Sequence, residues 1–110
     1  MRGLLLSCAL AAVVGLTGAP LASADTIDEM VKGTGALESP FWRSLYENGY
    51  GYLDAQRVSN DGKIACVNRQ AGVPPYQITP LMQSRGYTSE EAWAIVLAEE
   101  AASESAHAVC

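Results

Sequence analysis

The side chains best suited to metal binding or acid–base chemistry gather near the end of the sequence. His107 is the one histidine in the chain, and Glu99, Glu100 and Glu104 lie a few positions before it. On a helix, Glu100 and Glu104 would share a face with His107. A zinc site needs three or four ligands in a defined geometry. We therefore predict no metal site and interpret these residues as the solvated surface of a helix end.

Hydrolytic chemistry is not predicted either. A serine nucleophile needs a histidine base that an acid holds in place, and His107 alone could be that base. The sequence has no G-x-S-x-G, no P-loop and no G-x-G-x-x-G. Nothing in the sequence brings Asp61 to Glu91, and Glu90 beside Glu91 is interpreted as a helix-surface charge. We predict that the protein is not an enzyme.

Aromatic residues form the most unusual local feature, with five of them between positions 41 and 52. A common arrangement buries such residues in the core while tyrosines bridge core and water. A sharper hypothesis places a ligand pocket or partner surface there. A haem site with a tyrosine or histidine ligand has no motif to support it, so no cofactor is predicted. The candidate surface residues are Tyr46, Tyr50, Tyr52 and Trp93.

The N-terminus has the pattern of a secretory signal peptide. A charged Arg2 precedes an apolar run over 4–14, and small residues at 22–24 then supply an A-x-A cleavage pattern. We predict residues 1–24 as the signal peptide, cut between Ala24 and Asp25. Cys8 lies inside the apolar run, which continues past it, so lipidation at Cys8 is not expected. The alternative is an uncleaved anchor, although the run is short for a bilayer span of about 20 residues.

Two cysteines, Cys66 and Cys110, remain after cleavage, 44 positions apart. In an oxidising compartment an even pair predicts a disulfide. The chain-entropy model gives about 4 kcal/mol for closing a loop of this length. Free thiols and a bond between two molecules are the alternatives.

The charge of the mature chain excludes some partners. Six basic and twelve acidic residues follow position 24, a formal charge of −6. Nucleic acids and anionic lipids call for a basic patch, so neither is an expected partner. No later apolar run is long enough to span a membrane, which leaves an uncleaved signal as the only membrane attachment. The expected location is the cell envelope or outside the cell.

The elements that would position these residues are predicted to be helices. Residues 25–38 form an arm or a short helix, and Ser39-Pro40 begins a helix that stops at Asn48-Gly49. Asn60-Asp61 caps a third helix over 62–71. Prolines end that helix, and a short one follows over 81–85.

The last predicted helix begins with a capping box of Thr88 and Glu91 and runs to Ala108. Its length would be about 30 Å. No strand pattern competes, so the fold class is all-α: a small bundle of four to five helices with one disulfide, in a domain over 39–110. The inward stripe is predicted to be Ala92, Ile95, Val96, Ala102, Ala106 and Cys110.

Ten residues of the chain follow one another in an order that is seen in a known family. They are Phe41, Leu45 and Gly49, then Gly62, Cys66 and Gly72, and finally Gly86, Ala92, Val96 and Cys110. In this order the chain resembles the small exported mycobacterial two-cysteine proteins of domain-of-unknown-function family 732. The resemblance covers residues 38–110 and implies a helical, disulfide-linked, exported protein. It implies no activity, because the family has none assigned.

The functional prediction is an exported, non-enzymatic binding or interaction module whose partner is an unidentified protein or small molecule. The alternative is a carrier of a small apolar or haem-like ligand in a pocket lined by tyrosine and tryptophan.

Overall fold

The computed structural model describes residues 25–110. Within this range the chain forms five α-helices, one 3-10 helix and no strand, which confirms the all-α prediction. The predicted signal peptide, with Ala24 at its end, lies outside the described residues. The elements are α2 (Ile27–Thr34), η3 (Ala36–Glu38), α3 (Pro40–Glu47), α4 (Ala55–Gln70), α5 (Pro75–Ser84) and α6 (Ser89–Ala102).

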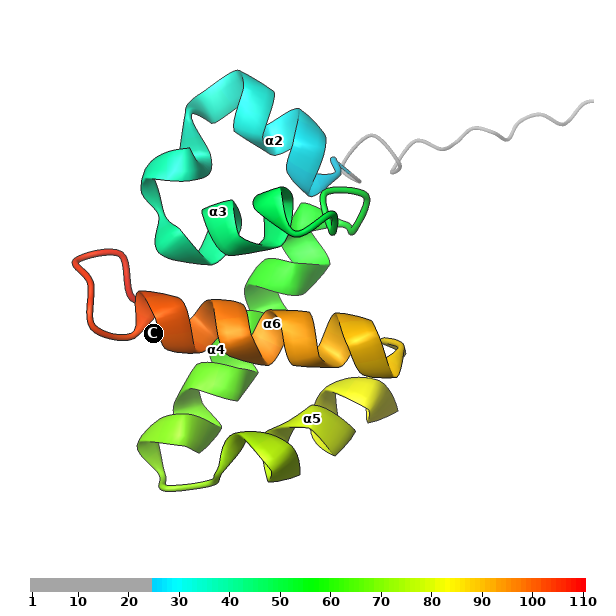
Figure 1. Cartoon of the computed structure of the whole chain (residues 1–110), viewed down its shortest axis with the longest axis vertical. Coiled ribbons are helices and arrows are strands. Elements are labelled where there is room, and N and C mark those ends of the chain that lie inside the picture. The colour runs from blue at the N-terminus through cyan, green and yellow to red at the C-terminus, as the bar shows by residue number, and fades with distance from the viewer. Residues whose placement is uncertain (1–24) are drawn as a thin grey trace, which may run out of the picture.

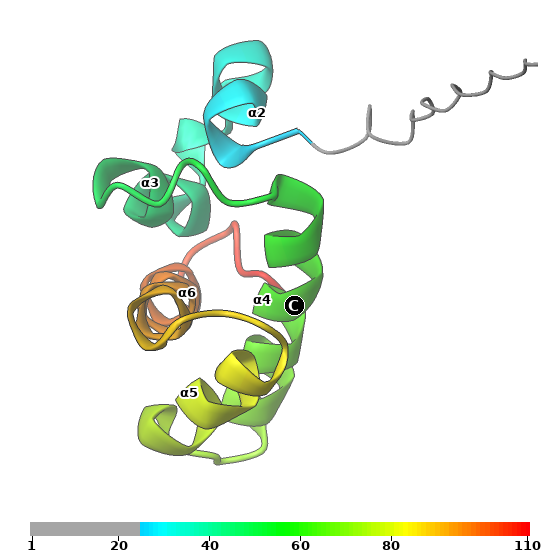
Figure 2. The same ribbon diagram turned by 90° about the vertical axis from the view of Figure 1, so that its right-hand side faces the viewer.

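The helices are arranged around α6. In Figure 1, α6 lies between α3 on one side and α5 on the other, and α4 crosses behind it. Figure 2 looks along α6 and shows α4 as the long helix that runs beside α3, α6 and α5. Helix α6 contacts α3, α4 and α5, while α2 packs on α3. Among the helices of residues 25–110, none combines the length and apolar character that a bilayer crossing needs.

The core is filled by apolar side chains from every α-helix, mostly aliphatic, together with Phe41 and Met82. Burying such side chains is the main driving force for packing these amphipathic helices together. The largest apolar side chains with under 2% exposure are Ile27, Leu45, Val58, Ile78, Met82, Ile95 and Val96.

The segment 25–38 is a helix rather than a loose arm. Thr26 and Glu29 form a capping box at the start of α2, each satisfying a backbone donor of the first turn. The backbone N–H of Ile27 donates to Leu53 O at 2.9 Å, and that of Ala55 donates to Asp25 O at 2.9 Å. These bonds attach the start of α2 to the segment that leads into α4.

Helix α4 begins earlier than predicted, at Ala55 instead of Gly62. Its cap is Asp54, whose side chain accepts a hydrogen bond from the Arg57 N–H. The predicted Asn60-Asp61 cap is wrong, because both residues lie inside the helix. A glycine is needed at position 62 of this helix because a Cβ there would lie 2.7 Å from Phe41 Cζ. The glycine lets α3 approach α4 closely.

Helix α5 also begins earlier, at Pro75, where a proline fits the first turn. It continues through Pro80, directly before Leu81, where the sequence predicts the helix to start. Thr79 Oγ1 donates to Pro75 O at 2.9 Å. Thr79 is therefore an interior residue bonded one turn back, and the predicted boundary before Leu81 is wrong.

Helix α6 begins with the predicted capping box, but it ends at Ala102 instead of Ala108. Ser103 Oγ donates to Glu100 O at 2.7 Å, and Ser105 Oγ donates to Ala102 O at 2.9 Å. These hydroxyls satisfy carbonyls at the helix end and compete with further turns. Ala106 and Cys110 therefore do not belong to the inward stripe of α6.

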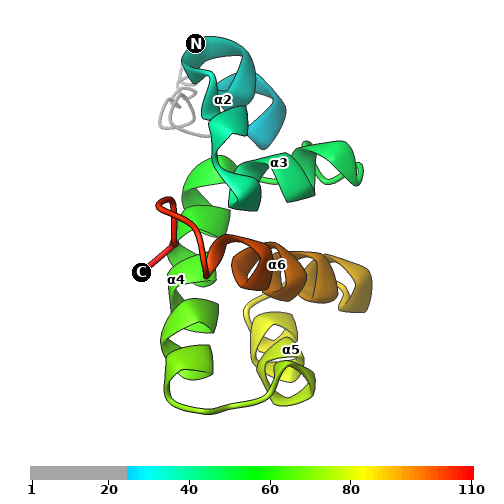
Figure 3. The same ribbon diagram turned by 60° about the vertical axis from the view of Figure 1, so that its left-hand side comes forward.

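The predicted disulfide joins Cys66 to Cys110, with Cα atoms 6.0 Å apart. Cys66 is fully buried in α4. Residues 103–110 leave α6 and turn back to α4, and Figure 3 shows the C-terminus beside that helix. The bond therefore closes a covalent loop that contains the end of α4 and all of α5 and α6.

Candidate binding groove between α3 and α6

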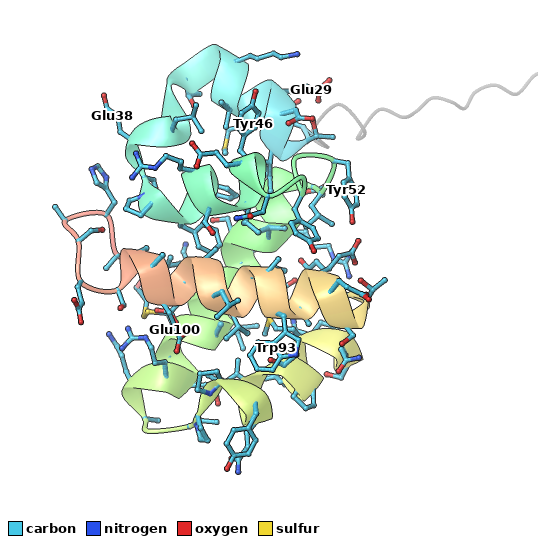
Figure 4. All side chains as sticks on the ribbon, viewed as in Figure 1. Glu29, Glu38, Tyr46, Tyr52, Trp93 and Glu100 are labelled. Carbon is cyan, nitrogen blue, oxygen red and sulfur yellow. A yellow bond between two sulfur atoms is a disulfide. The ribbon has the colours of Figure 1, made fainter. Side chains whose placement is uncertain are left out.

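A groove of about 420 Å³ lies between α3 and α6 and is open to solvent. One wall comes from α3 and the loop after it, and the other comes from the outer side of α6. In Figure 4 the labelled Trp93 side chain extends from α6 at the edge nearer α5. The lining residues are Ser44, Asn48, Tyr50, Ser89, Glu90, Trp93, Ala94 and Leu97.

Helical spacing builds the α6 wall. Trp93, Ala94 and Leu97 follow Glu90 by three, four and seven positions, so the four residues form one stripe on the helix. The opposite stripe of α6 is buried in the core. Helix α6 therefore carries apolar residues on two faces, and Trp93 and Leu97 remain 36% and 52% exposed.

A turn after α3 builds the other wall. Gly49 has φ +91°, a conformation that glycine adopts without a Cβ clash. The chain reverses there, and the Tyr50 N–H donates to Leu45 O at 2.9 Å. This bond holds Tyr50 beside the end of α3, where its side chain can line the groove.

The structure brings together two of the four aromatic residues singled out from the sequence. Tyr50 and Trp93 line the groove, whereas Tyr46 and Tyr52 do not. Tyr46 is half-buried and packs against the core. Tyr52 is 58% exposed and lies near the start of α6, as Figure 4 shows.

Tyr52 links the loop before α4 to α6. Its hydroxyl donates to Glu91 Oε2 at 2.6 Å, and this hydrogen bond is the main reason that the pKa of Tyr52 rises to about 12. The same hydrogen bond lowers the pKa of Glu91, and so does the hydrogen bond that the Thr88 backbone N–H donates to Glu91 Oε1. Glu91 is therefore held as a carboxylate.

Two carboxylates that the sequence assigns to a helix cap and to a solvated surface are buried. Asp61 is 1% exposed and pairs with Arg85, and Tyr87 donates to its Oδ2 at 2.7 Å. The pKa of Tyr87 is raised, mainly because its hydroxyl is buried and next because it donates a hydrogen bond to Asp61. Glu99 is fully buried and accepts from Arg69 Nε at 2.8 and 3.0 Å. The Asp61–Arg85 pair joins α4 to the end of α5, and the Glu99–Arg69 pair joins α6 to α4.

A polar hollow of about 370 Å³ lies over the Asp61 pair, lined in part by Arg57 and Arg85. Both guanidinium groups already have partners. Arg57 lies 4.4 Å from the Tyr87 ring centroid and donates to the Arg85 carbonyl. This hollow is therefore the surface of a structural ion pair, while the α3–α6 groove exposes apolar and aromatic groups.

His107 lies in the exposed tail after α6. Because α6 ends at Ala102, Glu104 and His107 are not on a common helical face with Glu100, which corrects the sequence interpretation. Within residues 25–110 no three histidine, cysteine, aspartate or glutamate residues come together as metal ligands.

Comparisons with known proteins return no relative. No protein-family model matches the chain, no curated protein matches it, and no solved structure matches it. What the protein does has to be inferred from the chemistry of its own residues.

Proposed function

We propose that this protein is an exported, non-enzymatic binding module that receives a partner protein in the groove between α3 and α6. The observation that carries the proposal is the exposure of Trp93 and Leu97 beside Tyr50 in that groove. Exposed aromatic side chains in a concave surface are typical of residues that dominate binding energy at protein interfaces. The serines and Asn48 at its margins supply a polar rim.

The openness of the groove favours a protein partner over a small ligand. Pockets for small ligands bury most of the ligand surface. Here Trp93 and Leu97 stay in contact with solvent, and the groove has walls on two sides. A partner that brings its own surface would complete the enclosure.

The second candidate is a carrier of a small apolar or haem-like ligand. The volume of about 420 Å³ supports it, because small-ligand sites span roughly 300–1,000 Å³. A stoichiometric complex with hemin that Trp93→Ala abolishes would favour the carrier. Absence of hemin binding at micromolar concentration would remove this candidate.

The proposal of export rests on the sequence of residues 1–24 and on the disulfide, since such bonds persist in oxidising compartments. Intact mass of the secreted protein tests it. The expected chain begins at Asp25 and gains two alkyl groups only after reduction. A measured mass that still includes residues 1–24 would contradict cleavage.

Membership of family 732 also remains a proposal. It is supported by the order of its motifs and by the spacing of Cys66 and Cys110. It adds a compartment and a helical fold, which agree with the proposed role, and no activity.

Panning a random 12-residue peptide library on the secreted, oxidised protein tests the groove. We expect the enriched peptides to lose at least about tenfold in affinity on Trp93→Ala, as for a residue that dominates an interface. They should bind normally to Tyr76→Ala, which removes an aromatic side chain that is 66% exposed on α5, outside the groove. Circular dichroism checks that both variants are folded. Failure to enrich any peptide, or equal binding to both variants, would contradict the proposal.

A further inference from the structure

Two hydrogen-bond acceptors of the groove are available to a ligand, the Glu90 carboxylate and Asn48 Oδ1. Glu90 is exposed, and within residues 25–110 its carboxylate has no hydrogen bond or ion pair. Asn48 Nδ2 donates to Ser44 O at 2.7 Å, which leaves Asn48 Oδ1 as an acceptor. The hydroxyl of Ser89 can accept or donate. A ligand that pairs with Glu90 and Asn48 Oδ1 should therefore carry hydrogen-bond donors.

The charge of the groove has one sign. Glu90 is the charged residue among its lining residues, and none of the six basic side chains after position 24 lines it. Residues 25–110 as a whole, Glu90 included, carry a formal charge of −6. Complementary charge is the usual relation between two protein surfaces that bind each other.

An anionic ligand has no comparable site here. The start of α6 would be the natural place for one, because helix N-termini attract anions. In this protein Thr88 and Glu91 already cap that terminus, with Thr88 Oγ1 bonded to the Glu91 N–H at 3.1 Å. An anion would also face the Glu90 carboxylate.

The Trp93 ring favours a planar cation as the ligand of the groove. Trp93 follows Glu90 by three positions, so the two side chains are neighbours on the helix surface. A tryptophan face attracts cations more strongly than the other aromatic rings do. A guanidinium group can stack on such a ring while its N–H groups reach a carboxylate.

We propose that the groove binds an arginine side chain of the partner protein, stacked on Trp93 and paired with Glu90. This inference rests on the proposed function of the groove. Asn48 Oδ1 accepts from the same guanidinium group, and Leu97 receives an apolar residue next to that arginine. The partner is therefore a protein segment in which an arginine is flanked by apolar residues.

Two matched probes test the inference: Ac-Gly-Leu-Arg-Leu-Leu-Gly-NH2 and the same peptide with citrulline, which keeps the shape of arginine without its charge. Each is titrated into the ¹⁵N-labelled, oxidised protein while the Trp93 indole resonance is followed. We expect the arginine peptide to bind about tenfold more tightly, and added salt to reduce this difference.

Glu90→Gln should remove the difference between the peptides. Glu100→Gln is the matched control, because Glu100 lies toward the other end of α6, outside the groove, and it should leave the difference intact (Figure 4). Both variants alter carboxylates that form no ion pair within the described residues, so both should fold.

Equal binding of the two peptides at the groove would overturn the arginine inference and leave the proposed function standing. A preference for arginine that persists in Glu90→Gln would also overturn it, since it would reflect the acidic surface as a whole. Failure of both peptides to shift Trp93 overturns it too. The proposed function is tested separately by the panning experiment, and it falls if no peptide is enriched or if the enriched peptides bind Trp93→Ala and Tyr76→Ala equally.

Discussion

Asp61 is a carboxylate that folding removes almost completely from water, with its charge paired to Arg85 and its second oxygen bonded to Tyr87. Asp61→Asn should lower the free energy of unfolding by about 1–3 kcal/mol, because Arg85 loses its ionic partner. We expect the lower part of this range, since the Arg85 side chain is 44% exposed and water screens it. Urea unfolding measures the change. Glu104→Gln, an exposed control, should change it by less than about 0.5 kcal/mol.

The hydrogen bond between Tyr52 and Glu91 predicts a pH dependence. The folded-state pKa of Tyr52, about 12, is above its ordinary value of 10.0, so the folded protein holds this proton more tightly. The stabilisation is complete below about pH 10 and is lost as pH rises toward 12. Glu91→Gln should return the pKa of Tyr52 toward 10.0, as measured by NMR titration of the tyrosine ring carbons. An unchanged pKa would show that the bond does not form in solution.

The sequence predicted local residue roles better than distant ones. Thr88 and Glu91 are three positions apart, and their capping box is present. The partner of Asp61 lies 24 positions away and that of Glu99 lies 30 positions away. A sequence pattern of charges does not reveal which carboxylate will be buried, because burial depends on how helices cross.

At the scale of the helices, the approach of α3 to α4 depends on Gly62. Alanine favours helix interiors over glycine by about 1 kcal/mol, but a Cβ at Gly62 would lie 2.7 Å from the Phe41 ring. Gly62→Ala should therefore destabilise the protein by about 1–3 kcal/mol. Gly33→Ala is the matched control, because a methyl group there would have no neighbouring atom within 4 Å, and it should stabilise α2 by about 0.5–1 kcal/mol. Equal effects in urea unfolding would mean that Phe41 moves aside freely.

Helix existence was predicted better than helix boundaries. Glycine, asparagine and aspartate at 60–62 favour a helix start by propensity, yet they lie inside α4. Packing against Phe41 and pairing with Arg85 outweigh those preferences. The end of α6 was missed for a related reason, since residues 103–110 include good helix formers but the tail turns back to α4.

For the whole molecule, the disulfide should contribute about 4 kcal/mol to the free energy of unfolding, the value for closing a loop across 44 positions. Cys66→Ala should lower the melting temperature of oxidised protein and keep helicity near native at low temperature. Cys110→Ser separates loss of the bond from loss of the buried Cys66 side chain. If both variants melted like the wild type in circular dichroism, the bond would be without consequence.

The groove itself was only partly predictable. Tyr50 and Trp93 were both singled out, but they are 43 positions apart, and their meeting depends on how α3 lies on α6. Tyr46 and Tyr52 have the same residue type as Tyr50. Their places on other surfaces follow from the turn at Gly49 and from the bond to Glu91.

The covalent loop also decides how the protein would respond to mechanical tension. A pull applied at Asp25 and Cys110 passes from Cys110 directly into Cys66 through the sulfur atoms. Helices α5 and α6 then carry no load, and only residues 25–66 can be drawn out, to at most about 140 Å. A chain stretched in this way would lose the α3 wall of its groove while keeping the α6 wall folded inside the loop.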